Sequence, residues 1–200
     1  METIIAASRN SGKIREMEAI TSCFGIKIIS RDEAGLPRDE VEEDGETFEE
    51  NSFKKASYIM ELSARPVIAD DSGLVVDCIG GAPGVYSARF AGTDCDDRKN
   101  NEKLIDLIKK FSYQKRTGRF VSVITMLYPD GRKFVARGEA EGHLILEEKG
   151  RNGFGYDPLF VPLGYDRTFA EMSPEEKNRI SHRGKALEKL HGLLAAEDRL

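Results

Sequence analysis

The chain has few cysteines, and they are arranged in no recognisable pattern. Of its 200 residues only Cys23, Cys78 and Cys95 are cysteines, and no two of them form a CxxC pair. An odd number of widely separated cysteines gives no support to a zinc or redox motif. Cys23 and Cys78 lie in apolar sequence and are expected to be small core residues. Cys95 lies among aspartates, a setting that does not activate a thiol as a nucleophile.

The chain also lacks a long apolar run, an N-terminal signal pattern and a surplus of basic residues. The longest apolar stretches are shorter than a membrane span, and the first residues predict a strand rather than a charged leader. With a formal net charge of −5, a broad nucleic-acid-binding face is not expected. We therefore expect a cytoplasmic protein with no membrane or nucleic-acid partner. A small anionic substrate remains compatible, because local lysine and arginine clusters can outweigh the net charge.

The length and the apolar periodicity predict one α/β domain over residues 1–200, since no repeat or linker interrupts the chain. Strands are expected over residues 2–7, 26–30, 120–128, 133–146 and 159–161, and helices over 11–24, 47–62, 96–111 and from 173 onward. Strands alternate with helices in the first part, whereas a hairpin follows later. This order predicts a mixed rather than a purely parallel sheet.

Two adjacent carboxylates, Asp70 and Asp71, follow the apolar run 66–69 and precede a second apolar run, 74–76. The second run is either the continuation of the first strand or its return. Such carboxylates are costly to bury unless a cation or hydrogen bonds compensate. Because side chains alternate along a strand, the two should point to opposite sides, so that one can face a catalytic metal. Taken alone, the segment is equally compatible with a polar turn.

Two further segments have the chemistry of a phosphate site. The loop at residues 8–13 joins a strand to a helix N-terminus, where free backbone N–H groups and the helix dipole attract phosphate oxygens. An acidic loop contains Glu42, Glu43 and Asp44, of which one could join Asp71 in holding Mg²⁺. In the helix that follows, Lys54 or Lys55 could face the same phosphates. Solvated surface remains the alternative for most of these charges.

The C-terminal part has two segments that could bind a base. In the glycine-rich loop 150–158, Phe154 can offer a ring face and Asp157 an acceptor, whereas inward packing suits Tyr156 better. The basic segment 177–183 either continues one helix or breaks at Ser181, which would then cap a new helix. A glycine-rich turn and a solvated basic helix face are the ordinary alternatives.

Taken in order, the motifs resemble those of the inosine triphosphate pyrophosphatase family, also described as dITP/XTP pyrophosphatases. The resemblance covers nearly the whole chain. It rests on the segments Ser8-x-Asn10-x-x-Lys13, Gly45-x-Thr47-Phe48-x-Glu50-Asn51, Ala69-Asp70-Asp71-Ser72-Gly73, Gly80-Gly81-Ala82-Pro83-Gly84, Gly153-Phe154-Gly155-Tyr156-Asp157-Pro158, Thr168-Phe169-Ala170-Glu171 and Ser181-His182-Arg183. Two positions depart from the family pattern. Arg9 stands where the family usually has glycine in the first loop, and Asn152 replaces a glycine before Gly153.

The resemblance implies an elongated α/β fold with a mixed twisted central sheet, flanking helices and two lobes around a substrate cleft, commonly in a homodimer. It implies Mg²⁺-dependent hydrolysis of a purine nucleoside triphosphate to the monophosphate and pyrophosphate. Asp71 would be the general base and, with Glu42, a metal ligand. The residues implied to bind substrate are Ser8, Arg9, Asn10, Ser11, Gly12, Lys13, Lys55, Ser72, Phe154, Gly155, Tyr156, Asp157, Lys177, His182 and Arg183.

The implied pocket predicts a preference among bases. Hypoxanthine and xanthine present a 6-keto acceptor, whereas adenine presents a 6-amino donor. Lys177 and Arg183 can only donate, so adenine would leave donors facing donors. ITP, dITP and XTP are therefore the expected substrates. The alternatives are a Maf-like nucleotide pyrophosphatase with another base preference, and a nucleotide-binding module without catalysis.

Overall fold

The computed structural model of the chain describes residues 2–37, 39, 41–93 and 95–197. Across these residues the strands form one mixed sheet in the order β2-β1-β3-β4-β5-β6. The strands are β1 (Glu2–Ala6), β2 (Ile26–Ile29), β3 (Val67–Val76), β4 (Thr117–Leu127), β5 (Lys133–Leu144) and β6 (Phe160–Pro162). β1 pairs in parallel with β2 and β3, whereas β5 and β6 are antiparallel. The predicted mixed α/β sheet is confirmed.

In the described part of the chain, every α-helix but the last begins directly after a residue whose side chain accepts a hydrogen bond from the first turn. The helices are α1 (Ser11–Thr21), α2 (Phe48–Ser63), α3 (Asp97–Ile108), α4 (Pro174–Ile180) and α5 (His182–Glu197). Thr47 and Ser173 each form the predicted capping box with the glutamate three residues later. Ser181 separates α4 from α5, so the basic segment breaks into two helices. No helix in the described part of the chain combines the length and apolarity that crossing a membrane requires.

The chain divides into two compact units. Unit 1 contains residues 1–71, 122–138 and 183–200, and unit 2 contains residues 72–121 and 139–182. The chain passes between the units inside β3, β4 and β5 and again at the start of α5. Whether the units behave as one domain stays a prediction.

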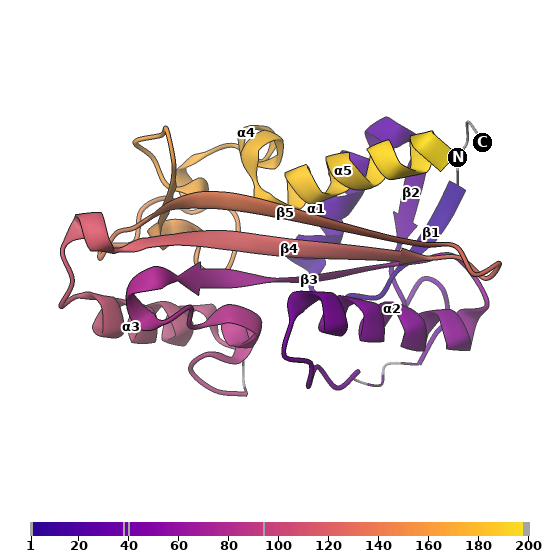
Figure 1. The fold of residues 1–200 in the computed structure, drawn as a ribbon, viewed down its shortest axis with the longest axis horizontal. Helices are drawn as coiled ribbons and strands as arrows, with labels where there is room; N and C mark the ends of the chain where they lie inside the picture. The colour runs from indigo at the N-terminus through magenta and orange to yellow at the C-terminus, as the bar shows by residue number, and fades with distance from the viewer. Residues whose placement is uncertain (1, 38, 40, 94, 198–200) are drawn as a thin grey trace. The chain divides into compact units, whose positions relative to one another are not determined.

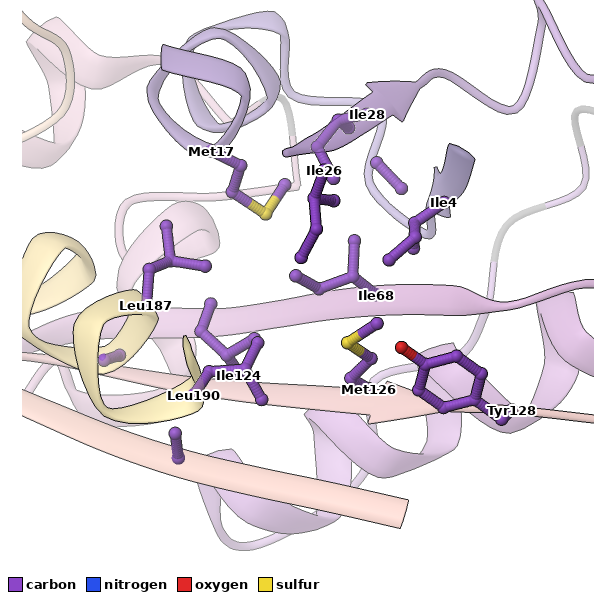
Figure 2. Close-up of a cluster of buried hydrophobic side chains, with 13 residues drawn as sticks. Ile4, Met17, Ile26, Ile28, Ile68, Ile124, Met126, Tyr128, Leu187 and Leu190 are labelled. Carbon is purple, nitrogen blue, oxygen red and sulfur yellow. The ribbon is translucent and has the colours of Figure 1, made fainter. Parts of the chain in front are cut away.

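Unit 1 has helices on both faces of its strands (Figure 1). On one face, Met17 of α1 and Leu187 and Leu190 of α5 pack against Ile4 and Ile68, as Figure 2 shows. On the other face, Ala56 and Ile59 of α2 pack with the odd-numbered strand residues Ile5, Val67 and Ala69. The alternation of strand side chains thus assigns each residue of β3 in this unit to one helix layer.

Unit 2 has its own core. Leu104 and Ile108 of α3 belong to it, together with an aromatic group in which Phe120 and Phe160 meet edge to face at a centroid distance of 4.8 Å. The expectation that Cys23 is a core residue is wrong, because Cys23 is exposed, whereas Cys78 is half-buried and packs against this core. Cys23 lies in the 3-10 turn Ser22–Phe24 that ends α1, so the α-helical period no longer sets the direction of its side chain.

Candidate active site

The paired aspartates lie inside one continuous strand, β3, rather than at a turn. Asp70 is on the face of Ile68, toward α1 and α5, whereas Asp71 is on the face of Ala69, toward α2. Both carboxylates are buried, with 1% and 4% of the residue exposed. Asp70 contacts residues of α1 and α5, and Asp71 contacts a residue of α2, which confirms that the two side chains point to opposite sides. Each face therefore has its own charge cluster.

On the α2 face, Asp71 is paired with a buried lysine. Lys55 Nζ donates to Asp71 Oδ1 at 2.7 Å and lies 3.3 Å from Glu43 Oε2. Burial raises the pKa of Asp71, and the nearby Glu43 charge adds to this, against the opposing attraction of Lys55 and Lys13. For Glu43 burial acts in the same direction, but Lys55 and Lys13 outweigh it and lower the pKa. The pKa values of the two carboxylates are thus shifted in opposite directions.

One oxygen of Asp71 is left for a ligand. Asp71 Oδ2 is buried and accepts no hydrogen bond from the described residues. A buried oxygen of this kind normally has a partner, whether protein, water or ion. Together with Glu43 it offers two carboxylates, the donor type that Mg²⁺ prefers. The described residues contain no group of three or more His, Cys, Asp or Glu side chains suited to a metal. A Mg²⁺ ion here would therefore complete its coordination with water and substrate oxygens.

On the opposite face, Asp70 is held by two cations and a hydroxyl. Lys13 Nζ lies 2.9 Å from Asp70 Oδ2, Arg183 Nη2 donates to the same oxygen at 3.1 Å, and Ser122 Oγ donates to Oδ1 at 2.5 Å. Burial alone would raise the pKa of Asp70, but the attraction of Arg183 and Lys13 and the Ser122 hydrogen bond hold it well below its usual range. Asp70 is therefore stabilised as the carboxylate and is a weaker proton acceptor than Asp71.

The loop before α1 has the predicted form. Asn10 caps the helix, since its Oδ1 accepts from Lys13 N at 3.0 Å, and the Asn10 N–H donates to Ser8 Oγ at 3.2 Å. Arg9, Asn10 and Ser11 are exposed, and Ser8, Gly12 and Lys13 are half-buried. The Lys13 N–H is used by this cap and the Lys13 ammonium lies against Asp70, so the first-turn N–H groups that could face an anion are those of Ser11 and Gly12.

The acidic loop contributes through one carboxylate. Glu43 reaches Lys55, whereas Glu42 is exposed and the Asp44–Lys54 ion pair is exposed as well. The structure therefore favours Glu43 over the predicted Glu42 as the partner of Asp71. The assignment of Glu42 as a metal ligand stays a prediction without structural support. Lys55, in contrast, contacts Asp71, and its predicted role in binding the triphosphate stays a prediction.

Unit 2 brings together the predicted base-binding residues Phe154, Asp157 and Lys177. Asp157 Oδ2 accepts from the Phe154 N–H at 2.9 Å and from Lys177 Nζ at 2.6 Å. Lys177 also lies over the Phe154 ring, 5.0 Å from its centroid. Lys177 and Asp157 are buried, and Phe154 is half-buried. The aspartate thus fixes both the ammonium group and the backbone that carries the ring.

Two other residues of the glycine-rich loop, Tyr156 and Gly155, form hydrogen bonds with residues outside the loop. Tyr156 is buried, as predicted, and its hydroxyl donates to Ser87 O at 2.8 Å. Burial raises its pKa far above the usual range. Gly155 N–H donates to Asp97 Oδ2 at 2.7 Å. Ser72, the first residue of unit 2, is half-buried beside Asp71 in β3.

His182 and Arg183 are consecutive but belong to different units. His182 is buried in unit 2 and stacks on Phe120, with ring centroids 4.8 Å apart. The Arg183 guanidinium is 1% exposed in unit 1 and pairs with Asp70 and with Glu16 of α1. The prediction made Arg183 a base-recognising donor alongside Lys177. The contacts described for Arg183 are with Asp70 and Glu16, and its role toward a base stays a prediction.

Sequence reasoning missed three residues of these clusters. Glu16 and Ser122 carry no motif, because a glutamate in a helix and a serine in a strand are ordinary until the fold brings them to Arg183 and Asp70. Asn51 belongs to the motif that begins at Gly45, but the motif does not predict that its side chain contacts the backbone of the acidic loop. A polar residue predicted on the inner face of α2, one turn before Lys55, was the available clue.

The fold and these clusters define an α/β protein with paired carboxylates in β3, buried lysines on α2 and α4, and a capped helix start at α1. The model of the Ham1 family matches residues 4–193, and the chain belongs to this family. It is 50% identical to a protein of Clostridium perfringens named dITP/XTP pyrophosphatase, over 95% of this chain and 96% of the relative. A protein of the same name from Desulforamulus reducens is 47% identical, with 96% and 94% covered.

Solved structures agree with the fold. A HAM1 protein from Coxiella burnetii superimposes with a TM-score of 0.86 at 38% identity, covering 98% of this chain and all of the other. The Ham1 protein of Staphylococcus aureus gives a TM-score of 0.84 at 40% identity, with 98% and 100% covered.

Proposed function

We propose that this chain hydrolyses the non-standard purine nucleoside triphosphates ITP, dITP and XTP to the monophosphate and pyrophosphate, removing deaminated purines from the nucleotide pool. The names of the relatives from Clostridium perfringens and Desulforamulus reducens support this reaction. The observation that carries it here is the buried Asp71 carboxylate, which pairs with Lys55 through one oxygen and keeps the other available.

Asp71 is the general base of the proposed reaction. Water that attacks the α-phosphorus must lose a proton as pyrophosphate departs, and a carboxylate with a raised pKa can accept it. Lys55 and Lys13 place positive charge where phosphate oxygens become more negative in the transition state. The start of α1, with the N–H groups of Ser11 and Gly12, would bind and orient the triphosphate.

The proposed cofactor is Mg²⁺, held by Asp71 and Glu43. The orphaned Asp71 Oδ2 and the adjacent Glu43 carboxylate fit such an ion. When bound, Mg²⁺ neutralises phosphate charge and lowers the pKa of a coordinated water. Glu43 replaces Glu42 in this proposal because only Glu43 has a contact with Lys55. Homodimeric assembly, which the motif resemblance implies, and a cytoplasmic location, which the sequence predicts, complete the proposal.

Base selection is assigned to the unit 2 group. The Lys177 ammonium, which donates to Asp157, can only donate hydrogen bonds, and a 6-keto oxygen of a base is an acceptor that suits it. The half-buried Phe154 ring offers a stacking face, and His182 lies beside Phe120 in the same unit. An adenine 6-amino group would place a donor against the Lys177 donor. Because Arg183 is engaged by Asp70 and Glu16, Lys177 carries this discrimination in the proposal.

The test is a substrate panel with the purified full chain and Mg²⁺. ITP, dITP, XTP, GTP, ATP and dTTP are compared, and pyrophosphate and orthophosphate are assayed separately. We expect pyrophosphate from ITP, dITP and XTP, with kcat/KM for ATP lower by about 10²-fold or more. Equal rates on ATP, a preference for dTTP, or orthophosphate as the product would each overturn the proposal. Binding without turnover would indicate a non-catalytic module.

A further inference from the structure

Asn51 is a fully buried polar residue of α2 that contacts the acidic loop instead of the core. Its exposed fraction is 0%. Its Oδ1 accepts from the Gly45 N–H at 2.8 Å, and its Nδ2 donates to the Gly45 carbonyl at 3.4 Å. Both ends of the amide are thus used on the backbone of a single residue. A side chain in this arrangement fixes the position of the loop main chain.

The approach of the loop to α2 is too close for any side chain at residue 45. A Cβ on Gly45 would lie 2.7 Å from Asn51 Oδ1 and 2.9 Å from Glu50 Cβ. The next two backbone N–H groups, of Glu46 and Thr47, both donate to Glu50 Oε2, at 2.8 and 3.2 Å. The loop is therefore held against the start of α2 at three successive residues.

The same face of α2 also holds a carboxylate of this loop. Lys55 follows Asn51 by one helical turn, so the two side chains lie on one side of the helix. Lys55 contacts Glu43, two residues before Gly45, and Asp71 of β3. Asn51 thus fixes the backbone beside Glu43, while Lys55 contacts the carboxylate itself. Only Asp44 separates Glu43 from the fixed backbone of Gly45, so a change at Asn51 is expected to displace Glu43.

We propose that Asn51 is a positioning residue for the metal site: through Gly45 it keeps Glu43 beside Asp71. This inference rests on the proposed function only in taking Asp71 and Glu43 as the Mg²⁺ ligands. It predicts that loss of the Asn51 amide weakens metal binding in the absence of any substrate. Residues that orient metal ligands typically change metal affinity by about 10- to 100-fold when substituted.

The first experiment measures Mn²⁺ binding to the full chain by electron paramagnetic resonance, with Asp71→Asn defining the binding that belongs to this site. We expect Asn51→Ala to weaken Mn²⁺ affinity by about tenfold or more. The control is Ser52→Ala. Ser52 is the adjacent buried polar residue of α2, and its hydroxyl donates to Thr125 Oγ1 at 2.6 Å. This variant should lose stability to urea but keep its Mn²⁺ affinity.

A double-mutant cycle then tests whether Asn51 acts through Glu43. In a Glu43→Gln background, Asn51→Ala should cause little further loss of Mn²⁺ affinity. Gly45→Ala should disturb the same contact from the loop side, and it replaces Asn51→Ala if that variant does not fold. An unchanged Mn²⁺ affinity, an equal loss in both backgrounds, or Mn²⁺ binding insensitive to Asp71→Asn would overturn the inference.

The outcome is separate from that of the substrate panel. A chain that releases no pyrophosphate, but whose Mn²⁺ affinity responds to Asn51 as described, retains the positioning role and loses the proposed reaction. If the chain releases pyrophosphate normally but Asn51→Ala leaves the Mn²⁺ affinity unchanged, the proposed reaction stands and the positioning role of Asn51 is lost. In an active enzyme, raising Mg²⁺ should restore the kcat of Asn51→Ala.

Discussion

At the scale of single residues, adjacent positions in one strand have opposite electrostatic roles. Asp70 is surrounded by Lys13, Arg183 and Ser122 and stays ionised. Asp71 has a raised pKa and an oxygen without a hydrogen-bond partner among the described residues. The difference follows from alternation, because each side chain faces a different helix layer. Only Asp71 therefore meets the requirements of a base.

Replacing Asp71 by Asn tests this assignment. The amide has nearly the same shape but takes up no proton, so kcat for ITP should fall by about 10²- to 10⁴-fold. Circular dichroism and urea unfolding should show that the fold is retained. Asp44→Asn is the control, since Asp44 lies in the acidic loop and pairs only with exposed Lys54 among the contacts described. Near-normal kcat in Asp71→Asn would remove Asp71 as the base.

Among single residues, the orientation of strand side chains could be predicted from the sequence, whereas contacts made by loop residues could not. The alternation of Asp70 and Asp71 could be predicted, since a strand has a fixed period of two. The choice between Glu42 and Glu43 could not, because a loop has no period and only the contact with Lys55 selects Glu43. The motif resemblance assigns Arg183 to the base pocket, and that assignment stays a prediction. The contacts of its guanidinium with Asp70 of β3 and Glu16 of α1 could not be predicted, because these residues are distant in sequence.

At the scale of elements, caps and periodicity predicted the helices and strands well. The capping boxes at Thr47 and Ser173 fixed two helix starts, because their hydrogen bonds are local. The apolar runs on either side of the two aspartates fit both a single continuous strand and a strand that turns back after Asp71. β3 continues through both aspartates to Val76. Pairing with a neighbouring strand, which sequence does not display, decides the matter.

The glycine-rich loop gives a prediction at this scale. Gly153 has a φ of +76°, and a Cβ there would lie 2.0 Å from Asp157 Oδ2. Gly153→Ala should therefore displace Asp157 from Lys177 and the Phe154 N–H, and raise KM for ITP more than it lowers kcat. Gly164→Ala is the control, since Gly164 has a φ of +86° with nothing within 4 Å of its Cβ.

Both substitutions carry a backbone cost of about 1–2 kcal/mol, so loss of stability alone should affect the two variants alike. Steady-state kinetics on ITP and urea unfolding separate the two effects. Equal KM values in Gly153→Ala and Gly164→Ala would show that the Asp157 contact does not shape the base site.

At the scale of the whole molecule, the two units are joined through secondary structure rather than linkers. The boundary falls between Asp71 and Ser72 in β3, between Val121 and Ser122 in β4, and between Gly138 and Glu139 in β5. Local unfolding of one unit would have to interrupt these strands in their middle. The division of the three strands between two units could not be predicted from the sequence. Length and the absence of a linker predict one domain and say nothing about units within it. We expect the chain to unfold as one cooperative domain.

Leu104→Ala tests that expectation. Leu104 of α3 is 0% exposed in the core of unit 2, and its truncation should cost about 2–5 kcal/mol. Native-state hydrogen exchange compares the slowest amides of α3, in unit 2, with those of β1, in unit 1. If the units unfold together, the free energy of opening falls by the same amount in both, because a common global transition exposes them. A loss confined to α3 and its neighbours, with β1 unchanged, would mean that the units unfold separately and are two domains.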